Sequence, residues 1–242
     1  MNNFDIRSPV FFTYLFLSLL VGVPVFFLVE KSFFIPLVVA LASSFLLILI
    51  MIRVAPGAVL RSFDSIPANE KQFPRLHNAL EGICVNHGLD KPDVYVIENP
   101  RGNAAAVADK RSQAVVLTTG AIDSLNLIEI EGLLAQLIAK CIDKRLPKKT
   151  VEAFFLRLPF IGVFVDNKKY VNDVRLEDVK GAELTRYPPG VQKSLLALKD
   201  LGTEIEDAPK STSHLWLMSP KGLNTEDTHP STEERVSAME EL

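Results

Sequence analysis

Histidine and cysteine are the residue types that most readily bind metals or act as nucleophiles, and this chain has few of them. The sequence of 242 residues contains four His and two Cys. Cys84 and Cys141 fall on different predicted helices without paired spacing, which argues against a disulfide framework or a cysteine metal site and favours a reducing compartment. His77, His87 and His214 are expected at a helix surface, a helix end and a core edge, and their spacing forms no metal-binding pattern.

The most unusual polar residues lie in a helix predicted from Asn126 to Asp143. Gln136 and Lys140 are four positions apart, so both project from one face of that helix. Two histidines at this spacing, with Glu after the first, would bind zinc and supply a general base. Here Gln136 is a poor zinc ligand, protonated Lys140 is none, and Leu137 cannot move a proton. Taken alone, these residues could also be the ordinary polar edge of an amphipathic helix.

The beginning of the chain is strongly apolar. No charged side chain occurs from Ser8 to Val29 or from Ser32 to Ile52. Each stretch has about 20 residues, which is enough to cross about 30 Å of hydrocarbon as a helix. We therefore predict a transmembrane hairpin in residues 1–53, with helices at about 8–29 and 32–52 and a tight turn at residues 30–32. A cleaved signal peptide fits less well, because a second apolar stretch follows at once.

Basic residues beside the hairpin predict its orientation. Arg7 precedes it, Arg53, Arg61 and Lys71 follow it, and the turn carries the single Lys31. The positive-inside bias places both termini and the soluble domain on the cytoplasmic side of an inner or plasma membrane. The net charge of −3 and the lack of a basic stripe interleaved with aromatics predict no nucleic-acid partner.

After a linker predicted at 54–72, residues 73–242 have the pattern of a soluble α+β domain. Apolar periodicity predicts a helix over 73–87 that ends at Gly88. Short apolar runs bounded by turn signals predict short strands at 93–97, 103–108 and 113–118. Further helices are expected at 126–143, 176–185, 190–201 and 230–242. The stretch 151–165 is too short and too polar to span a membrane, and could be a membrane-grazing hairpin or a packed loop.

Six segments in a fixed order carry a resemblance to a known family. They are Lys91–Ile97, Gly102–Ala106, Val115–Gly120, Ile130–Ala135, Ala182–Pro188 and Thr228–Arg235. Each is weak alone, but their order and spacing resemble the HtpX-like membrane zinc metallopeptidases, relatives of the CAAX prenyl proteases. The resemblance implies a gluzincin-like domain with a small mixed sheet and helices behind the membrane hairpin, and a link to protein quality control.

The resemblance also identifies where the family's zinc site would be. The two histidine ligands fall on Gln136 and Lys140, and the general base falls on Leu137. The third ligand in such enzymes is a Glu four residues before an Asp. That Asp matches Asp178, so the Glu position is Val174. The resemblance therefore implies that three ligands and the base have all been replaced, and we expect no catalytic residue, no metal and no cofactor.

Other family positions are retained. By resemblance, His229 and Arg235 face the substrate and the developing oxyanion, although His229 could equally cap the turn into the last helix. One segment matches the edge strand on which such enzymes hold an extended peptide by backbone pairing. Its residues are Asn103, Ala104, Ala105 and Ala106. Asn103 could equally be a turn residue.

Loss of a zinc ion would leave nearby acids without their cation. We therefore expect the ammonium group of Lys140 to take the place of the metal and to pair with Asp178.

These inferences predict a catalytically inactive, membrane-anchored pseudopeptidase. Its expected partners are the lipid bilayer and either extended segments of membrane proteins or an active homologous protease that it modulates. The alternative is an active zinc-dependent membrane endopeptidase with substitute ligands, in which case zinc is the cofactor. A third interpretation is a membrane-anchored packing subunit without a peptide cleft.

Overall fold

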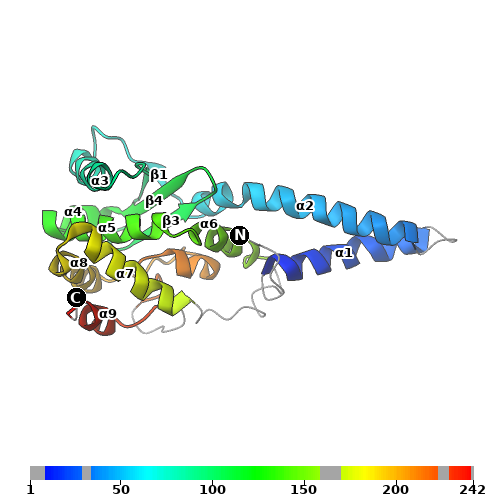
Figure 1. The fold of residues 1–242 in the computed structure, drawn as a ribbon. Helices are drawn as coiled ribbons and strands as arrows, with labels where there is room; N and C mark the ends of the chain where they lie inside the picture. Colours follow the sequence, from blue (N-terminus) through cyan, green and yellow to red (C-terminus); the bar gives the residue numbers. More distant parts are fainter. Residues whose placement is uncertain (1–8, 29–33, 159–169, 223–228, 241–242) are drawn as a thin grey trace.

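Two long apolar helices form the beginning of the chain. The structure, a computed structural model, describes residues 9–28, 34–158, 170–222 and 229–240. Helices α1 (Pro9–Leu28) and α2 (Phe34–Arg61) run antiparallel, side by side, and project from one end of the remaining domain (Figure 1). Both are long and apolar enough to span a membrane, with mean hydropathy of 2.3 and 2.8. The predicted apolar hairpin is confirmed, while its turn at residues 30–32 lies outside the described residues.

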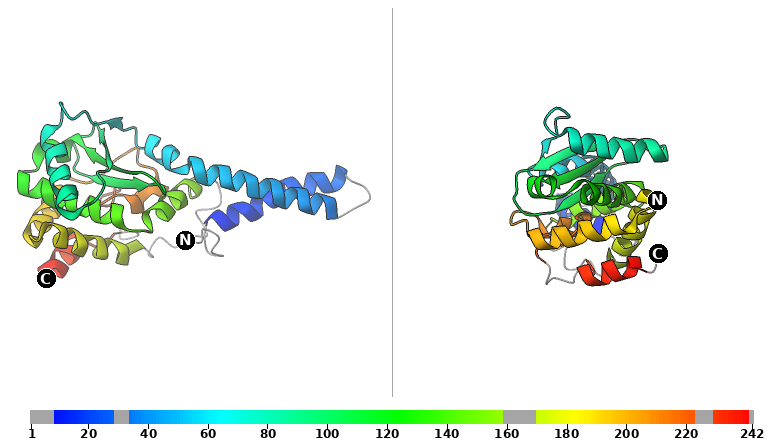
Figure 2. Two further views of the ribbon diagram at one scale, coloured as in Figure 1. Left: turned by 45° about the horizontal axis from the view of Figure 1, so that its top comes forward. Right: turned by 90° about the vertical axis from the view of Figure 1, so that its left-hand side faces the viewer.

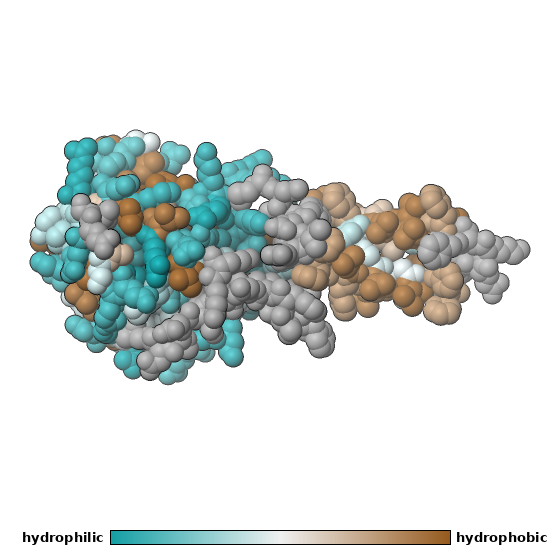
Figure 3. Space-filling model, turned by 60° about the horizontal axis from the view of Figure 1, so that its bottom comes forward, coloured by the Kyte–Doolittle hydropathy of each residue, from teal (hydrophilic) through white to brown (hydrophobic). Residues whose placement is uncertain are grey.

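Hydropathy separates the hairpin from the domain. Apolar side chains cover most of the described hairpin surface in Figure 3, whereas the domain is mostly hydrophilic on the same face. Side chains such as Leu19, Phe27, Phe34 and Leu46 are exposed on the hairpin. Large exposed apolar surfaces of this kind mark contact with lipid or with another protein.

Helix α2 continues beyond the point where its polar residues begin. It runs through Pro56 to Arg61 and so covers the first part of the predicted 54–72 linker. Ala55 and Val59 are fully buried on this extension. The helix persists because one of its faces still packs on the domain after the apolar stretch has ended.

The sheet has four strands in the order β1-β2-β4-β3. The strands are β1 (Ile66–Pro67), β2 (Asp93–Ile97), β3 (Ala104–Ala108) and β4 (Gln113–Thr118). β2 is parallel to β4, and the other two pairs are antiparallel. The three predicted strands and the mixed sheet are confirmed. β1 was not predicted, because two residues that include Pro67 carry no alternating pattern.

Helices surround this sheet. They are α3 (Pro74–His87), α4 (Thr119–Ser124), α5 (Leu127–Ile142), α6 (Leu146–Phe155), α7 (Val171–Thr185), α8 (Pro188–Leu201), the 3-10 helix η3 (Lys210–Leu215) and α9 (Thr232–Glu240). α5 lies between the sheet and the layer formed by α7 and α8 (Figures 1 and 2). Asn126 and Glu129 form a capping box at its start, and Gly88 ends α3 with a φ of 62°. The α+β expectation is confirmed.

Helix α6 differs from expectation. It covers residues 146–155 and so overlaps the beginning of the 151–165 stretch, where we expected a membrane-grazing hairpin or a loop; residues 159–165 lie outside the described residues. Val151 and Phe155 of α6 join Val10, Ile48 and Ala55 in an apolar cluster that ties the hairpin to the domain. The sequence did not predict α6, because the apolar residues of this helix pack against residues of α1 and α2, which are distant in the chain.

Candidate functional site

Helix α5 directs Gln136 and Lys140 toward α7. Gln136 is 0% exposed and Lys140 is 1% exposed. The two helices approach closely because α7 has Gly181 at the contact, where a Cβ atom would lie 3.0 Å from Cγ of Gln136. These two residues are therefore not the solvated edge of an amphipathic helix.

Gln136 joins three helices. Its Nε2 donates a hydrogen bond to Oδ1 of Asp178 on α7 at 2.6 Å, and its Oε1 accepts one from Ser194 on α8 at 3.2 Å. Asp178 also accepts two hydrogen bonds from Arg235 on α9, both at 2.7 Å. Nη1 of Arg235 donates to the Leu217 carbonyl at 2.8 Å. Asp178 and Arg235, which the resemblance expects to be retained, thus form a bidentate buried pair, the strongest common form of such contacts.

Lys140 has a different acidic partner from the one we expected. Its Nζ donates to Oε2 of Glu177 at 2.8 Å and to the Trp216 carbonyl at 3.2 Å. The predicted pairing with Asp178 is therefore wrong. Asp178 is already bound by a guanidinium and an amide, while the longer side chain of its neighbour Glu177 reaches Lys140.

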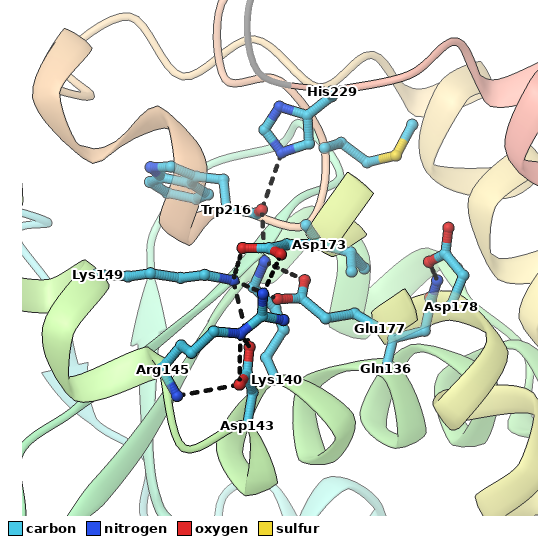
Figure 4. A network of polar contacts seen from close by, with 12 residues as sticks. Gln136, Lys140, Asp143, Arg145, Lys149, Asp173, Glu177, Asp178, Trp216 and His229 are labelled. Carbon is cyan, nitrogen blue, oxygen red and sulfur yellow. Dashed lines mark hydrogen bonds and ion pairs between the residues drawn. The ribbon is translucent and has the colours of Figure 1, made fainter. Parts of the chain in front are cut away.

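Glu177 connects Lys140 to a second group of charges at the beginning of α6 and α7 (Figure 4). Its Oε1 accepts a hydrogen bond from Lys149 at 2.9 Å. Lys149 also lies 3.0 Å from Asp173 and 3.5 Å from Asp143, and Arg145 pairs with both of these acids. We call these six residues, Lys140, Asp143, Arg145, Lys149, Asp173 and Glu177, the ion network. Its three cations face three acids, as the burial of charge requires.

Burial and neighbouring charges shift pKa values in the ion network. Burial alone would raise the pKa of Glu177, but Lys140 and Lys149 outweigh it and hold that pKa below its ordinary value. Burial lowers the pKa of Lys140, and Glu177 acts against this shift. The carboxylate of Glu177 is therefore ionised at neutral pH and serves as the counter-charge for two ammonium groups.

His229 lies next to the ion network and is buried. Its Nε2 is 3.0 Å from the Trp216 carbonyl, which also accepts the bond from Lys140. Because a carbonyl only accepts, Nε2 carries the proton. Burial lowers the pKa of His229 to about 3, so the ring is neutral at pH 7. The expected substrate-facing residue thus contacts the backbone of its own chain.

Strand β3 is the edge strand that the sequence predicted, but its outer edge is covered. The amide of Leu217 donates to the Ala104 carbonyl at 2.7 Å, and Trp216 forms an antiparallel bridge with Ala105. The side-chain amide of Asn103 donates to the carbonyls of Thr203 and Met218 at 2.9 and 3.1 Å. Asn103 through Ala106 are all buried. An extended peptide could pair with β3 only by displacing residues 216–218.

The donor set at the family's zinc position does not fit a zinc ion. Val174 and Leu137 are buried aliphatic side chains, and Leu137 belongs to the main apolar core. Among the described residues, no group of three or more His, Cys, Asp or Glu side chains is arranged to hold a metal. The nearest acids, Glu177 and Asp178, already bind cations at 2.7–2.9 Å. Zinc prefers free imidazole, thiolate or carboxylate donors.

Of the six residues of the ion network, sequence reasoning singled out only Lys140. Glu177, Asp173, Lys149 and Arg145 were not singled out as site residues. Asp173 and Glu177 are four apart and share a helix face, but α7 was predicted to begin only at residue 176. That later start removed the one signal that could have identified the pair.

Comparisons with known proteins find one group of similar sequences. The chain is 25% identical over 229 residues to a protein named Protease HtpX homolog from Caldanaerobacter subterraneus subsp. tengcongensis, covering 76% of this chain and 77% of that relative. It is 26% identical over 211 residues to proteins of the same name from Dictyoglomus thermophilum and Tropheryma whipplei, covering 70% of this chain and 70% and 72% of the relatives.

No protein-family model matches the chain, and no solved structure matches it. The apolar hairpin and the α+β domain behind it define a class of protein with two helices long and apolar enough to span a membrane, followed by a mixed domain. Within this class, the relatives support an HtpX-like family for the chain.

Proposed function

We propose that this chain is an HtpX-like pseudopeptidase, anchored in the membrane, that no longer hydrolyses peptide bonds and acts by binding another membrane protein. The contact of 2.8 Å between Lys140 and Glu177 supports this most directly. It places a paired ammonium group where the resemblance expects the second histidine ligand. A cation there repels a metal ion instead of binding it.

The neighbouring residues support the same conclusion. Zinc hydrolysis requires three protein ligands, an open coordination position and a base that activates water. Gln136 uses both ends of its amide for Asp178 and Ser194. Leu137 and Val174 have no donor atom. Each component of the chemistry is therefore missing or committed to another contact.

The geometry favours a partner membrane protein over an extended peptide. Residues 216–218 occupy the edge of β3 that a peptide would need. In contrast, the hairpin exposes large apolar side chains along its described length. Helices of a partner, including an active homologous protease, could pack there within the bilayer. The same surface would anchor the chain in lipid.

Metal analysis and proteolysis of the purified full-length protein test the loss of catalysis. After equilibration with zinc and removal of the excess, we expect far less than one zinc per chain. We also expect unfolded casein to stay intact with and without a chelator. Stoichiometric zinc together with chelator-sensitive cleavage would overturn the proposal and favour an enzyme with substitute ligands.

A rebuilt site provides a matched variant. The substitutions Gln136→His, Leu137→Glu, Lys140→His and Val174→Glu restore the family's donor set. We expect this variant to take up about one zinc per chain, whereas a control with only Gln136→His and Lys140→His should bind zinc much more weakly. Gel filtration and circular dichroism establish that both variants are folded. A folded rebuilt variant without zinc would show that these positions do not form a vacated site.

Photo-crosslinking distinguishes the two modes of binding. A photoreactive residue in place of exposed Leu46 should give adducts with membrane proteins in native membranes. A soluble photoreactive peptide should give none with Asn103–Ala106. Peptide adducts on that strand, with none from position 46, would favour peptide binding at the family's cleft.

A further inference from the structure

A separate pocket of about 700 Å³ lies where α2 leaves its apolar stretch. Its walls come from α2, from the turn between β3 and β4, and from the segment that joins α5 to α6. The vacated positions Gln136 and Lys140 do not line it. The pocket therefore does not belong to the site already described.

Positive charge dominates the rim of this pocket. Five cations line it: Arg53, Lys110, Arg111, Lys144 and Lys148. The one acid in the lining is Asp109, whose Oδ1 accepts hydrogen bonds from the backbone amides of Arg111 and Ser112, both at 2.6 Å. Over the described ranges, none of the five cations lies within 4 Å of a carboxylate. We call these five residues the basic rim.

Apolar side chains also line the pocket. Leu49 and Ile52 of α2 and Val151 of α6 line it. Leu49 is on the exposed side of α2, where it continues the apolar surface formed by Phe45 and Leu46 nearer the start of the helix. The pocket is therefore amphipathic, with an apolar wall that extends along the membrane helix and a cationic rim beyond it.

The position of the pocket along α2 matches the edge of a bilayer. From Phe34 to Ile52 the helix has no charged side chain, a length of about 28 Å at 1.5 Å per residue. The hydrocarbon core of a bilayer is about 30 Å thick. Arg53, the first charge in α2, therefore lies at the level of lipid headgroups, and the other rim residues surround the same pocket.

We propose that this pocket binds a phospholipid with an anionic headgroup. The phosphate and the anionic headgroup lie among the side chains of the basic rim, and one acyl chain lies along Leu49 and Ile52. Charge complementarity supports this occupant, because clustered Lys and Arg beside a membrane helix attract anionic lipids. The apolar wall distinguishes a lipid from a free phosphate ion, which could use only the rim.

Native mass spectrometry of the full-length protein in detergent tests the proposal. The probes are phosphatidylglycerol and phosphatidylcholine with identical acyl chains, and glycerol phosphate as a headgroup without chains. We expect phosphatidylglycerol to bind at least about tenfold more tightly than phosphatidylcholine, given the attraction of each basic residue for anionic lipid. Glycerol phosphate at millimolar concentration should not displace it.

Two rim variants and a matched control locate the site. K110Q/R111Q and K144Q/K148Q should each weaken phosphatidylglycerol binding by about tenfold or more while leaving phosphatidylcholine binding unchanged. K180Q/K193Q removes the same charge from exposed positions on α7 and α8, away from the pocket, and should bind like the parent protein. Unchanged phosphatidylcholine binding also shows that the variants are folded.

Three results would overturn the proposal. Rim variants that bind phosphatidylglycerol like the parent would exclude the pocket. Equal weakening in K180Q/K193Q would show a non-specific effect of net charge. Glycerol phosphate or an acidic peptide that competes as effectively as the lipid would identify an anion site without an acyl chain.

Discussion

The ion network and the basic rim are two groups of charges that share α6 but differ in how they are balanced. In the ion network three cations meet three acids and most of the side chains are buried. In the basic rim five cations meet one acid that is occupied by backbone amides. Buried charge must be paired within the protein, whereas charge at a membrane surface can remain available for a ligand.

Adjacent residues take part in the two groups. Lys148 lines the pocket, and Lys149 is buried between Glu177 and Asp173. Successive residues on a helix point about 100° apart, so Lys148 faces the pocket and Lys149 faces the core. The function of a lysine here depends on its helix face and not on its sequence neighbourhood.

Of the substitutions in the ion network, removal of Glu177 should lower the unfolding free energy most. Glu177→Ala leaves Lys140 and Lys149 short of counter-charge in the interior, and we expect a loss of about 3–5 kcal/mol in unfolding free energy. Lys140→Met should cost less, because Glu177 keeps Lys149. Denaturant unfolding in detergent measures both. A loss below about 1 kcal/mol for Glu177→Ala would show that Lys140 and Lys149 do not depend on Glu177 as their counter-charge.

The adjacent lysines offer a sharper comparison. Lys149→Met leaves Asp173 and Asp143 with Arg145 as their remaining partner in the network, and should lower the unfolding free energy by about 2–3 kcal/mol. Lys148→Met removes the same charge from the rim and should change it by less than about 0.5 kcal/mol. Equal losses would contradict the division between the two groups.

Acid should weaken the region around the ion network through its buried histidines. Burial lowers the pKa of His214 to about 4 and that of His229 to about 3. Above pH 6.5 both rings are neutral in the folded and unfolded states. Below pH 6.5 only the unfolded chain takes up these protons, so each histidine costs about 1.4 kcal/mol per pH unit until its folded pKa is reached.

Thermal unfolding between pH 7 and pH 4.5 checks this dependence. His229→Gln should remove about half of the slope that the two histidines contribute. Glu177 adds to this slope only near the lower end of the range, where the unfolded chain begins to protonate this carboxylate while its lowered pKa keeps it ionised in the folded protein. An unchanged slope in the variant would show that His229 is protonated in the folded protein.

The smallest effect on stability is expected in the basic rim. K110Q/R111Q should leave the unfolding free energy within about 0.5 kcal/mol of the parent protein, because both side chains are exposed. The same variant should lose affinity for anionic lipid. A large loss of stability would mean that the rim has a structural role like that of the ion network.

Local patterns predicted much of the fold. The charge-free stretches predicted α1 and α2, short apolar runs between turn signals predicted β2 to β4, and Gly88 marked the end of α3. The spacing of four residues also placed Gln136 and Lys140 on one helix face, and the resemblance identified them as positions where zinc ligands are replaced. Helix α6 was missed because its apolar face is completed by α1 and α2, far away in the chain.

The sequence by itself determined the apolar hairpin and the strands, since these depend on residue types at short spacing, whereas the replacement of zinc donors is what the resemblance implies. Only the tertiary structure decided that Lys140 pairs with Glu177 instead of its neighbour Asp178. It also decided that residues 216–218 cover β3, a contact in which Asn103 meets Met218, 115 positions later. Such choices depend on how distant elements rotate and pack against one another, and short spacing does not encode that.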